Sequence, residues 1–278
     1  MYKRQVLVAR EAGNWKDLHR SISDLYGEPP DEVVDYAHKV LASIEVPPPK
    51  GPSFGAEELA ARLRRDVEKV APGWRVEVSD DYTARVTVVG ILKLLAVKEG
   101  AKFTEEEYVK LKVHEVGVHI GRFVNGERQP LEIFKFGFVH YLEAEEGLAT
   151  YAEERAGVLS PQVLRRYAGR VLASRYTLTM SFHEVYTELR RHFPEHEAYA
   201  IAERVKRGVV DTGVPGGYTK DQIYLSGYLK VREISEDDLC LLFVGKVGLE
   251  DLPKVRRWVE QGMLTVPDLP KWATGGGR

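Results

Sequence analysis

The sequence contains one cysteine among 278 residues, and this scarcity limits the chemistry open to the chain. A single thiol excludes an intramolecular disulfide framework and a metal site built from several cysteines. Cys240 lies in an apolar run at residues 239–243, where we expect a packed thiol rather than a reactive one. The lack of disulfides favours a reducing compartment, so we expect a cytoplasmic protein.

Long hydrophobic runs and an excess of one charge are also missing. The apolar run at residues 239–244 is far shorter than the roughly 20 residues that span a bilayer. The N-terminal apolar stretch is too short for a signal peptide. Lys and Arg number 40 against 42 Asp and Glu, a formal net charge of −2. We therefore predict no membrane association and no broad electrostatic binding of nucleic acid. The oligomeric state is not predicted.

Hydrophobic residues make up 44% of the chain, enough for a globular core. Prolines cluster at residues 46–52 (VPPPKGP), which excludes a regular helix or a central strand there and indicates a stiff linker. The linker predicts two parts, a small helical N-terminal segment at residues 1–45 and a main domain at residues 53–270.

Hydrophobic periodicity predicts a small antiparallel sheet followed by many helices. Strands are expected at residues 74–78, 85–89 and 91–97. The first alternates in strand fashion, the second is rich in β-branched residues, and turn signals separate the three. Helical spacing predicts helices at residues 31–44, 56–70, 105–123, 141–156, 161–178, 181–192, 194–207, 220–234 and 249–261. The fold class is therefore α+β, with a mainly helical body.

The helix at residues 105–123 carries the segment His114-Glu115-Val116-Gly117-Val118-His119. Thr104 is its expected N-cap, with a glutamate three residues later, and the Asn125-Gly126 turn pair is expected to follow its end. The segment differs by one extra residue from the H-E-x-x-H helix of zinc peptidases. Residues five apart on a regular α-helix lie about 140° apart, so the two histidines would not meet. A π-bulge would bring them onto one face, and Gly117 would ease that distortion.

Two histidines beside a glutamate suit a hydrolytic zinc site. Zinc binds imidazole and carboxylate, lowers the pKa of a bound water to about 7 and polarises a carbonyl. Glu115 would then act as the base. On histidine spacing alone, an unrelated buried and exposed pair is an equal alternative. Other divalent metals also suit imidazole–carboxylate sites.

A third ligand is expected from the following predicted helix. Glu146 precedes the apolar stretch Gly-Leu-Ala-Thr-Tyr-Ala, so its carboxylate should point inward and needs a partner. The neighbouring Glu143, Glu153 and Glu154 are interpreted as a solvated acidic face. His114, His119 and Glu146 are therefore the candidate ligands of one metal ion.

The sequence also resembles a known family. The histidine segment, followed by Glu145-Glu146-Gly147-Leu148-Ala149, resembles the QEGLA-motif bacterial proteins, which are similar to the microtubule-associated tyrosine carboxypeptidases of animals. A further match is the segment GGYTKDQIYLSG at residues 216–227. The likeness covers roughly residues 74–234, and its motifs are specific in combination.

The resemblance implies a zincin-like metallopeptidase fold with one zinc ion per chain. It implies His114, His119 and Glu146 as zinc ligands, Glu115 as catalytic base, and a peptide or protein C-terminus as substrate. Glu145 stands where the motif has glutamine, and the chain is short for the family. A tubulin substrate is therefore not implied.

A carboxypeptidase also needs a cation for the substrate carboxylate and a donor for the oxyanion. Lys220 and Arg122 are candidates for the cation, and Tyr224, four residues after Lys220 on the same predicted helix, for the catalytic donor. The alternatives are a surface salt bridge for Lys220, core packing for Tyr224, and for Arg122 a structural pair with a carboxylate such as Glu132.

Two other functions stay open. One is a zinc amidohydrolase that acts on a small-molecule amide, and the other is a catalytically inactive zincin-like binding or regulatory module. The presence of the base and all three candidate ligands argues against the inactive module. The pair His183-Glu184 is interpreted as the start of an ordinary helix capped by Ser181.

Overall fold

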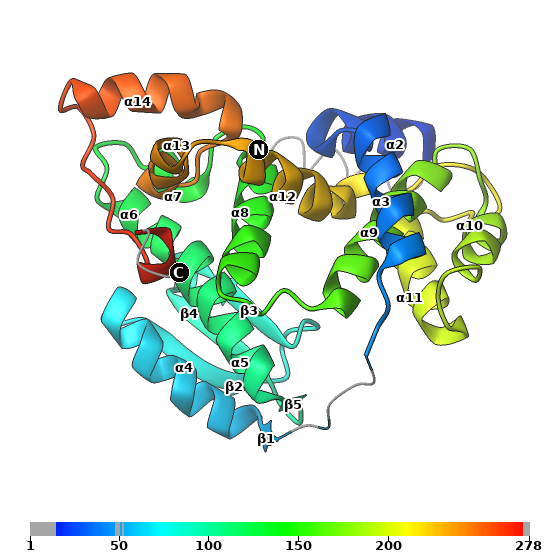
Figure 1. Ribbon diagram of the computed structural model, residues 1–278, viewed down its shortest axis with the longest axis horizontal. Helices are drawn as coiled ribbons and strands as arrows, with labels where there is room; N and C mark the ends of the chain where they lie inside the picture. Colours follow the sequence, from blue (N-terminus) through cyan, green and yellow to red (C-terminus); the bar gives the residue numbers. More distant parts are fainter. Residues whose placement is uncertain (1–14, 48–50, 52, 275–278) are drawn as a thin grey trace. The chain divides into compact units, whose positions relative to one another are not determined.

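The computed structural model describes residues 15–47, 51 and 53–274, which form two compact units (Figure 1). Unit 1 comprises Met1–Pro47 and Ser160–Leu229, and unit 2 comprises Pro48–Leu159 and Lys230–Arg278. The predicted linker coincides with the first boundary, although residues 48–50 and 52 lie outside the described part. The sequence-based division differs beyond that point, because residues 160–229 group with the N-terminal helices.

Unit 2 contains a three-stranded sheet of β2 (Arg75–Ser79), β3 (Val86–Val89) and β4 (Leu94–Lys98). The strands match the prediction, but the sheet is mixed, not purely antiparallel. Its order is β2-β4-β3, with β4 antiparallel to β3 and parallel to β2. The link after β2 takes the chain to the far edge, and the 3-10 turn η1 (Gly90–Leu92) returns it between the two strands. β4 is thus the central, buried strand.

A separate pair of two-residue strands, β1 (Phe54–Gly55) and β5 (Lys102–Phe103), is antiparallel. Neither strand was predicted, because two residues show no periodicity. Helix α4 (Ala56–Val70) begins directly after β1, packs on the sheet and matches its predicted range.

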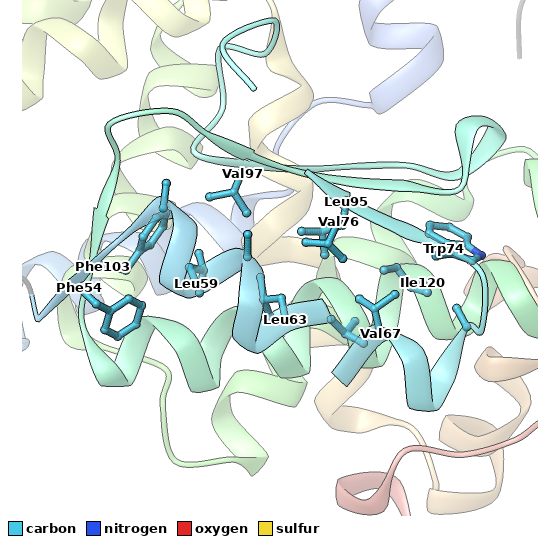
Figure 2. Packing of buried hydrophobic residues seen from close by; sticks show 14 of the residues in the cluster. Phe54, Leu59, Leu63, Val67, Trp74, Val76, Leu95, Val97, Phe103 and Ile120 are labelled. Atoms are coloured by element: carbon cyan, nitrogen blue, oxygen red, sulfur yellow. The ribbon is translucent and has the colours of Figure 1, made fainter. Parts of the chain in front are cut away.

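A hydrophobic cluster fills the space between α4, the sheet and the helix that carries the histidines (Figure 2). Its labelled members include Leu59, Leu63, Val76, Leu95 and Ile120. Each such side chain, once fully buried, stabilises the fold by about 1.5–3 kcal/mol. The cluster therefore holds one face of the histidine helix against a rigid sheet.

The histidine helix is continuous but changes its geometry along its length. It consists of α5 (Glu105–Leu111), a π-helix η2 (Lys112–Ile120) and α6 (Gly121–Glu127). Thr104 and Glu107 form the predicted capping box at its start. The prediction of a turn at Asn125-Gly126 is wrong, since both residues lie inside α6. Gly126 is needed there because α7 (Ile133–Phe136) passes directly over it.

The rest of unit 2 forms a second cluster around α8 (Tyr141–Arg155). Val118 of the π-helix, Leu148 of α8 and Phe243 of the 3-10 turn η4 (Leu242–Val244) are among its buried members. The remaining elements are α13 (Glu236–Leu241), η5 (Leu249–Asp251), α14 (Leu252–Glu260) and η6 (Lys271–Ala273). The π-helix thus contributes side chains to both clusters of unit 2.

Unit 1 is helical in its described residues. α9 (Pro161–Tyr176) contacts α3, α10, α11 and the 3-10 turn η3, which surround it. The elements of unit 1 are α2 (Trp15–Tyr26), α3 (Asp31–Ser43), α9, α10 (Phe182–Leu189), α11 (Glu195–Lys206), η3 (Thr219–Gln222) and the part of α12 (Ile223–Glu233) up to Leu229. The predicted helix at residues 220–234 is divided between η3 and α12. Ser181 caps α10 as predicted. Among the described residues, no helix combines the length and apolarity that crossing a bilayer requires.

Candidate metal centre

His114 and His119, which would not meet on a regular α-helix, are brought together by the π-helix, as expected for a π-bulge. Their ring centroids lie 4.9 Å apart, with the ring planes inclined at 69°. A π-helix bonds residue i to residue i+5, so residues five apart share a face. Gly117 lies inside this segment. The extra residue in the histidine motif is therefore absorbed by the helix itself.

Each histidine is oriented by a buried carboxylate of α8. The Nδ1 atom of His114 lies 2.7 Å from Oε1 of Glu153, and Nδ1 of His119 lies 2.8 Å from Oε1 of Glu145. An Nδ1–H that donates to a carboxylate fixes the tautomer, leaves Nε2 as the free lone pair and makes it more basic. This pattern is typical of metal-binding histidines.

Glu146 faces both free nitrogens. Its Oε2 atom lies 4.0 Å from Nε2 of His114 and 3.9 Å from Nε2 of His119. The three side chains are largely buried but retain 10–15% exposure, so a small ion can reach them. Two imidazole nitrogens and one carboxylate oxygen are a donor set that fits zinc and related divalent metals. The predicted ligands are thus brought together.

Glu115 belongs to the same cluster. One ligand atom from each of His114, Glu115 and His119 lies within 4.8 Å of the others. Its carboxylate is partly exposed. Glu115 therefore stands close enough to the histidine nitrogens to exchange a proton with a water bound there.

Glu145 contacts His119 and two further basic side chains. Its Oε1 also accepts a hydrogen bond of 2.8 Å from Lys246 Nζ, and its Oε2 accepts one of 3.1 Å from Arg122. Burial would raise the pKa of Glu145, but Lys246, His119 and Arg122 together hold it well below its usual value. The carboxylate thus stays ionised without solvent.

The environment of His119 favours its protonated form when no metal is bound. Burial alone would lower the pKa of His119. The hydrogen bond and charge of Glu145, with the charges of Glu146 and Glu115, outweigh burial and raise the pKa to about 9. A cation is therefore favoured at this position, whether a proton or a metal ion supplies the charge.

Arg122 supports the site from within the protein. The side chain is fully buried. Its Nε donates to the carbonyl oxygens of Leu242 and Gly245 at 2.8 and 3.0 Å, and Nη2 donates to Val247 at 2.8 Å. These contacts match the structural alternative for Arg122, with Glu145 as its carboxylate, and give no support to binding of a substrate carboxylate. Glu132, the partner suggested by the sequence, pairs with Lys135.

Lys220 and Tyr224 belong to unit 1, whereas the histidine pair belongs to unit 2. Lys220 lies in η3 and Tyr224 in α12, so they do not share one regular helix. The Tyr224 ring stacks on Tyr167 at a centroid distance of 5.1 Å. Their roles in binding a substrate carboxylate and an oxyanion stay predictions.

Three residues of the site were missed by sequence reasoning. Glu153, interpreted as solvated, is fully buried, and Glu145 is 3% exposed. A signal for Glu153 was present, because residues seven apart share one helix face and Glu153 follows the inward Glu146 by seven. Lys246 carried no comparable signal, since it comes from a loop distant in sequence.

Fold and site together define an α+β protein with a buried histidine–glutamate cluster suited to a metal ion. The chain belongs to the microtubule-associated tyrosine carboxypeptidase family, whose sequence pattern matches residues 2–276. It is 32% identical over 156 residues to microtubule-associated tyrosine carboxypeptidase 1 of Homo sapiens, which covers 51% of this chain and 31% of the human protein. The Mus musculus protein of that name is 30% identical over 171 residues, covering 57% and 35%. The matches thus span about a third of these relatives.

Proposed function

We propose that this chain is a zinc-dependent carboxypeptidase that removes the C-terminal residue of a peptide or protein. One observation carries the metal assignment. The Nδ1 atoms of both histidines are turned to buried carboxylates, while both Nε2 atoms face Oε2 of Glu146 at 4.0 and 3.9 Å. Family membership supports a carboxypeptidase over hydrolysis of a small-molecule amide.

His114, His119 and Glu146 would hold one zinc ion, which would polarise the scissile carbonyl and acidify a water. Glu115 accepts the proton of that water and passes it to the leaving amine, because its carboxylate lies beside the histidine nitrogens. Glu145 and Glu153 keep both imidazoles in one tautomer and one orientation. Each proposed role is supported by a separate geometric observation.

Metal content of the purified protein is the first test of the ligand set. We expect about one zinc per chain, and a sharp loss in Glu146→Ala. Glu143→Ala is the matched control, since Glu143 lies on the same helix but pairs with Lys230 at 2.7 Å. Zinc retained in Glu146→Ala, or absent from the wild type after zinc is supplied, would remove the basis of the proposal.

Catalysis is tested separately from metal binding. Peptides of varied C-terminal residue are incubated with the protein, and products one residue shorter are sought by mass spectrometry. Glu115→Gln should keep its zinc but lose the activity, because it cannot accept a proton. Full activity in Glu115→Gln would refute the base assignment. Cleavage of N-acyl amides but not of peptides would favour the amidohydrolase, and metal binding without cleavage the inactive module.

A further inference from the structure

A cavity lined mainly by charged residues lies in unit 1, between α9 and α11. Its volume is about 520 Å³, within the range of small-molecule sites. Four arginines line it, Arg166 and Arg170 from α9, with Arg204 from α11 and Arg207 directly after it. None of these residues belongs to the histidine cluster or to the proposed reaction.

Three of the arginines share the carboxylate of Asp221. Asp221 accepts hydrogen bonds from Arg204, and from Arg207 at 3.3 Å, while Arg170 Nε lies 4.0 Å from its nearer oxygen. One buried carboxylate therefore faces three guanidinium groups. Arg166 contacts a second carboxylate, Glu197, at 3.4 Å. Glu203, the other acidic residue in the lining, is exposed.

Arg170 has a buried donor atom, Nε, that lacks a hydrogen-bond acceptor among the described residues. Tyr167 and Tyr224 hold the guanidinium in place, with ring centroids 5.7 and 5.5 Å from its central carbon. A buried donor without an acceptor costs about 1–3 kcal/mol. An anion in the cavity would supply the acceptor.

We infer that this cavity binds a phosphate-bearing small molecule. A phosphate group offers several anionic oxygens, so it can accept from guanidinium groups on both walls at once, and arginine forks match its geometry. A volume of about 520 Å³ leaves room for an organic group, and Ala200 and Ile201 provide apolar lining for it.

The test is calorimetric titration of the full chain with inorganic phosphate and with adenosine 5′-monophosphate at constant ionic strength. We expect one saturable site per chain. Arg166→Gln and Arg207→Gln should each weaken it about tenfold or more, as expected for loss of a charged hydrogen bond. Arg166 is exposed and Arg207 is partly exposed, so the fold should survive their replacement. Tighter binding of the nucleotide would indicate an organic phosphate rather than the free ion.

Arg191→Gln is the matched control. It makes the same change of charge in unit 1, but Arg191 is exposed and pairs with Glu188 outside the cavity. Binding should be unchanged in this variant. The inference is overturned if phosphate does not saturate, if Arg191→Gln weakens it as much as Arg207→Gln, or if neither cavity variant weakens it. The proposed function is tested by zinc content and peptide cleavage, so its outcome is independent of this titration.

Discussion

Glu153 contacts the candidate metal site through His114. Its Oε1 lies 2.7 Å from His114, while its Oε2 has no hydrogen-bond partner among the described residues and lies 3.7 Å from Lys110 Nζ. A fully buried carboxylate in this state is unfavourable unless it has a strong cationic neighbour. The hydrogen bond to His114 and the positive charge of a metal ion bound beside it would supply that stabilisation.

Replacing Glu153 with alanine should therefore weaken zinc binding while the three ligands remain. Loss of such an orienting partner typically reduces metal affinity about 10–100-fold. Competition with a chromophoric chelator would measure the change. Glu154→Ala is the control, because Glu154 lies next in sequence but pairs with Arg232. Equal affinities in both variants would show that Glu153 does not orient His114.

Zinc affinity should depend on pH through His119. The pKa of its imidazole in the metal-free protein is raised to about 9, so at pH 7 the ring is protonated and the metal must displace that proton. Apparent affinity should rise by about tenfold per pH unit between pH 7 and 9, then level off. Titrations in buffers of different ionisation enthalpy should detect about one released proton. An affinity independent of pH in this window would contradict the protonated state.

Single residues were predictable where the motif itself fixed their environment. The histidine motif and the apolar stretch after Glu146 singled out His114, His119 and Glu146, which the structure brings together, while their role as ligands stays a prediction. Glu145 and Glu153 were not identified as supports, because an acidic residue on a helix looks the same in sequence whether solvent or a histidine faces it. Packing against a second helix determines whether the acidic residue faces solvent or a histidine.

Packing on both sides stabilises the π-helix. Val116 and Ile120 belong to the cluster with α4 and the sheet, whereas Val118 belongs to the cluster with α8. π-helices are rare and occur mostly as short distortions at functional sites. Here two hydrophobic clusters stabilise a nine-residue π segment and fix the histidine geometry.

Two glycines of this helix should respond differently to alanine. A Cβ on Gly126 would lie 2.6 Å from the carbonyl carbon of Phe134, so Gly126→Ala should destabilise the fold by about 1–3 kcal/mol. A Cβ on Gly117 would meet Trp272 Nε1 at 3.4 Å, an ordinary contact, so Gly117→Ala should change stability by less than about 1 kcal/mol. Urea denaturation compares the two. Equal losses would show that close packing at Gly126 is not decisive.

The helices that were predicted lie within a few residues of those observed, but α2, α7 and α13 were not predicted, and the sheet was predicted less well. The capping box at Thr104 and the range of α4 follow from local sequence alone. The position of β4 between β2 and β3 depends on which edge the chain reaches after residue 80, and strand periodicity does not encode that choice. The prediction of a fully antiparallel sheet failed for this reason.

The two units have separate candidate sites, with the histidine cluster in unit 2 and the arginine cavity in unit 1. Their grouping was not predictable, because it joins residues 1–47 to residues 160–229 through contacts distant in sequence. The proline-rich linker marked one boundary. The return of the chain at residue 230 lies within α12 and leaves no compositional signal.

Zinc should stabilise unit 2 where its ligands lie. A ligand that binds the folded state suppresses local opening of the elements that hold it. Hydrogen exchange should therefore slow most in the π-helix (Lys112–Ile120) and in α8 (Tyr141–Arg155) when zinc is added. Glu146→Ala should show no such slowing. Slowing confined to residues 160–229 would place the metal elsewhere.

Arg122 sets an order of events during synthesis. The carbonyl oxygens that accept hydrogen bonds from Arg122 belong to residues 120 to 125 positions further along the chain. The histidine helix therefore reaches its final environment only after those residues have been made. At about 5–20 residues per second, a ribosome takes roughly 6–25 s to supply them. Until then the guanidinium lacks its carbonyl partners and Glu145 lacks Lys246. The growing chain therefore carries both histidines well before residues 242–247, which complete the surroundings of Arg122, have been made.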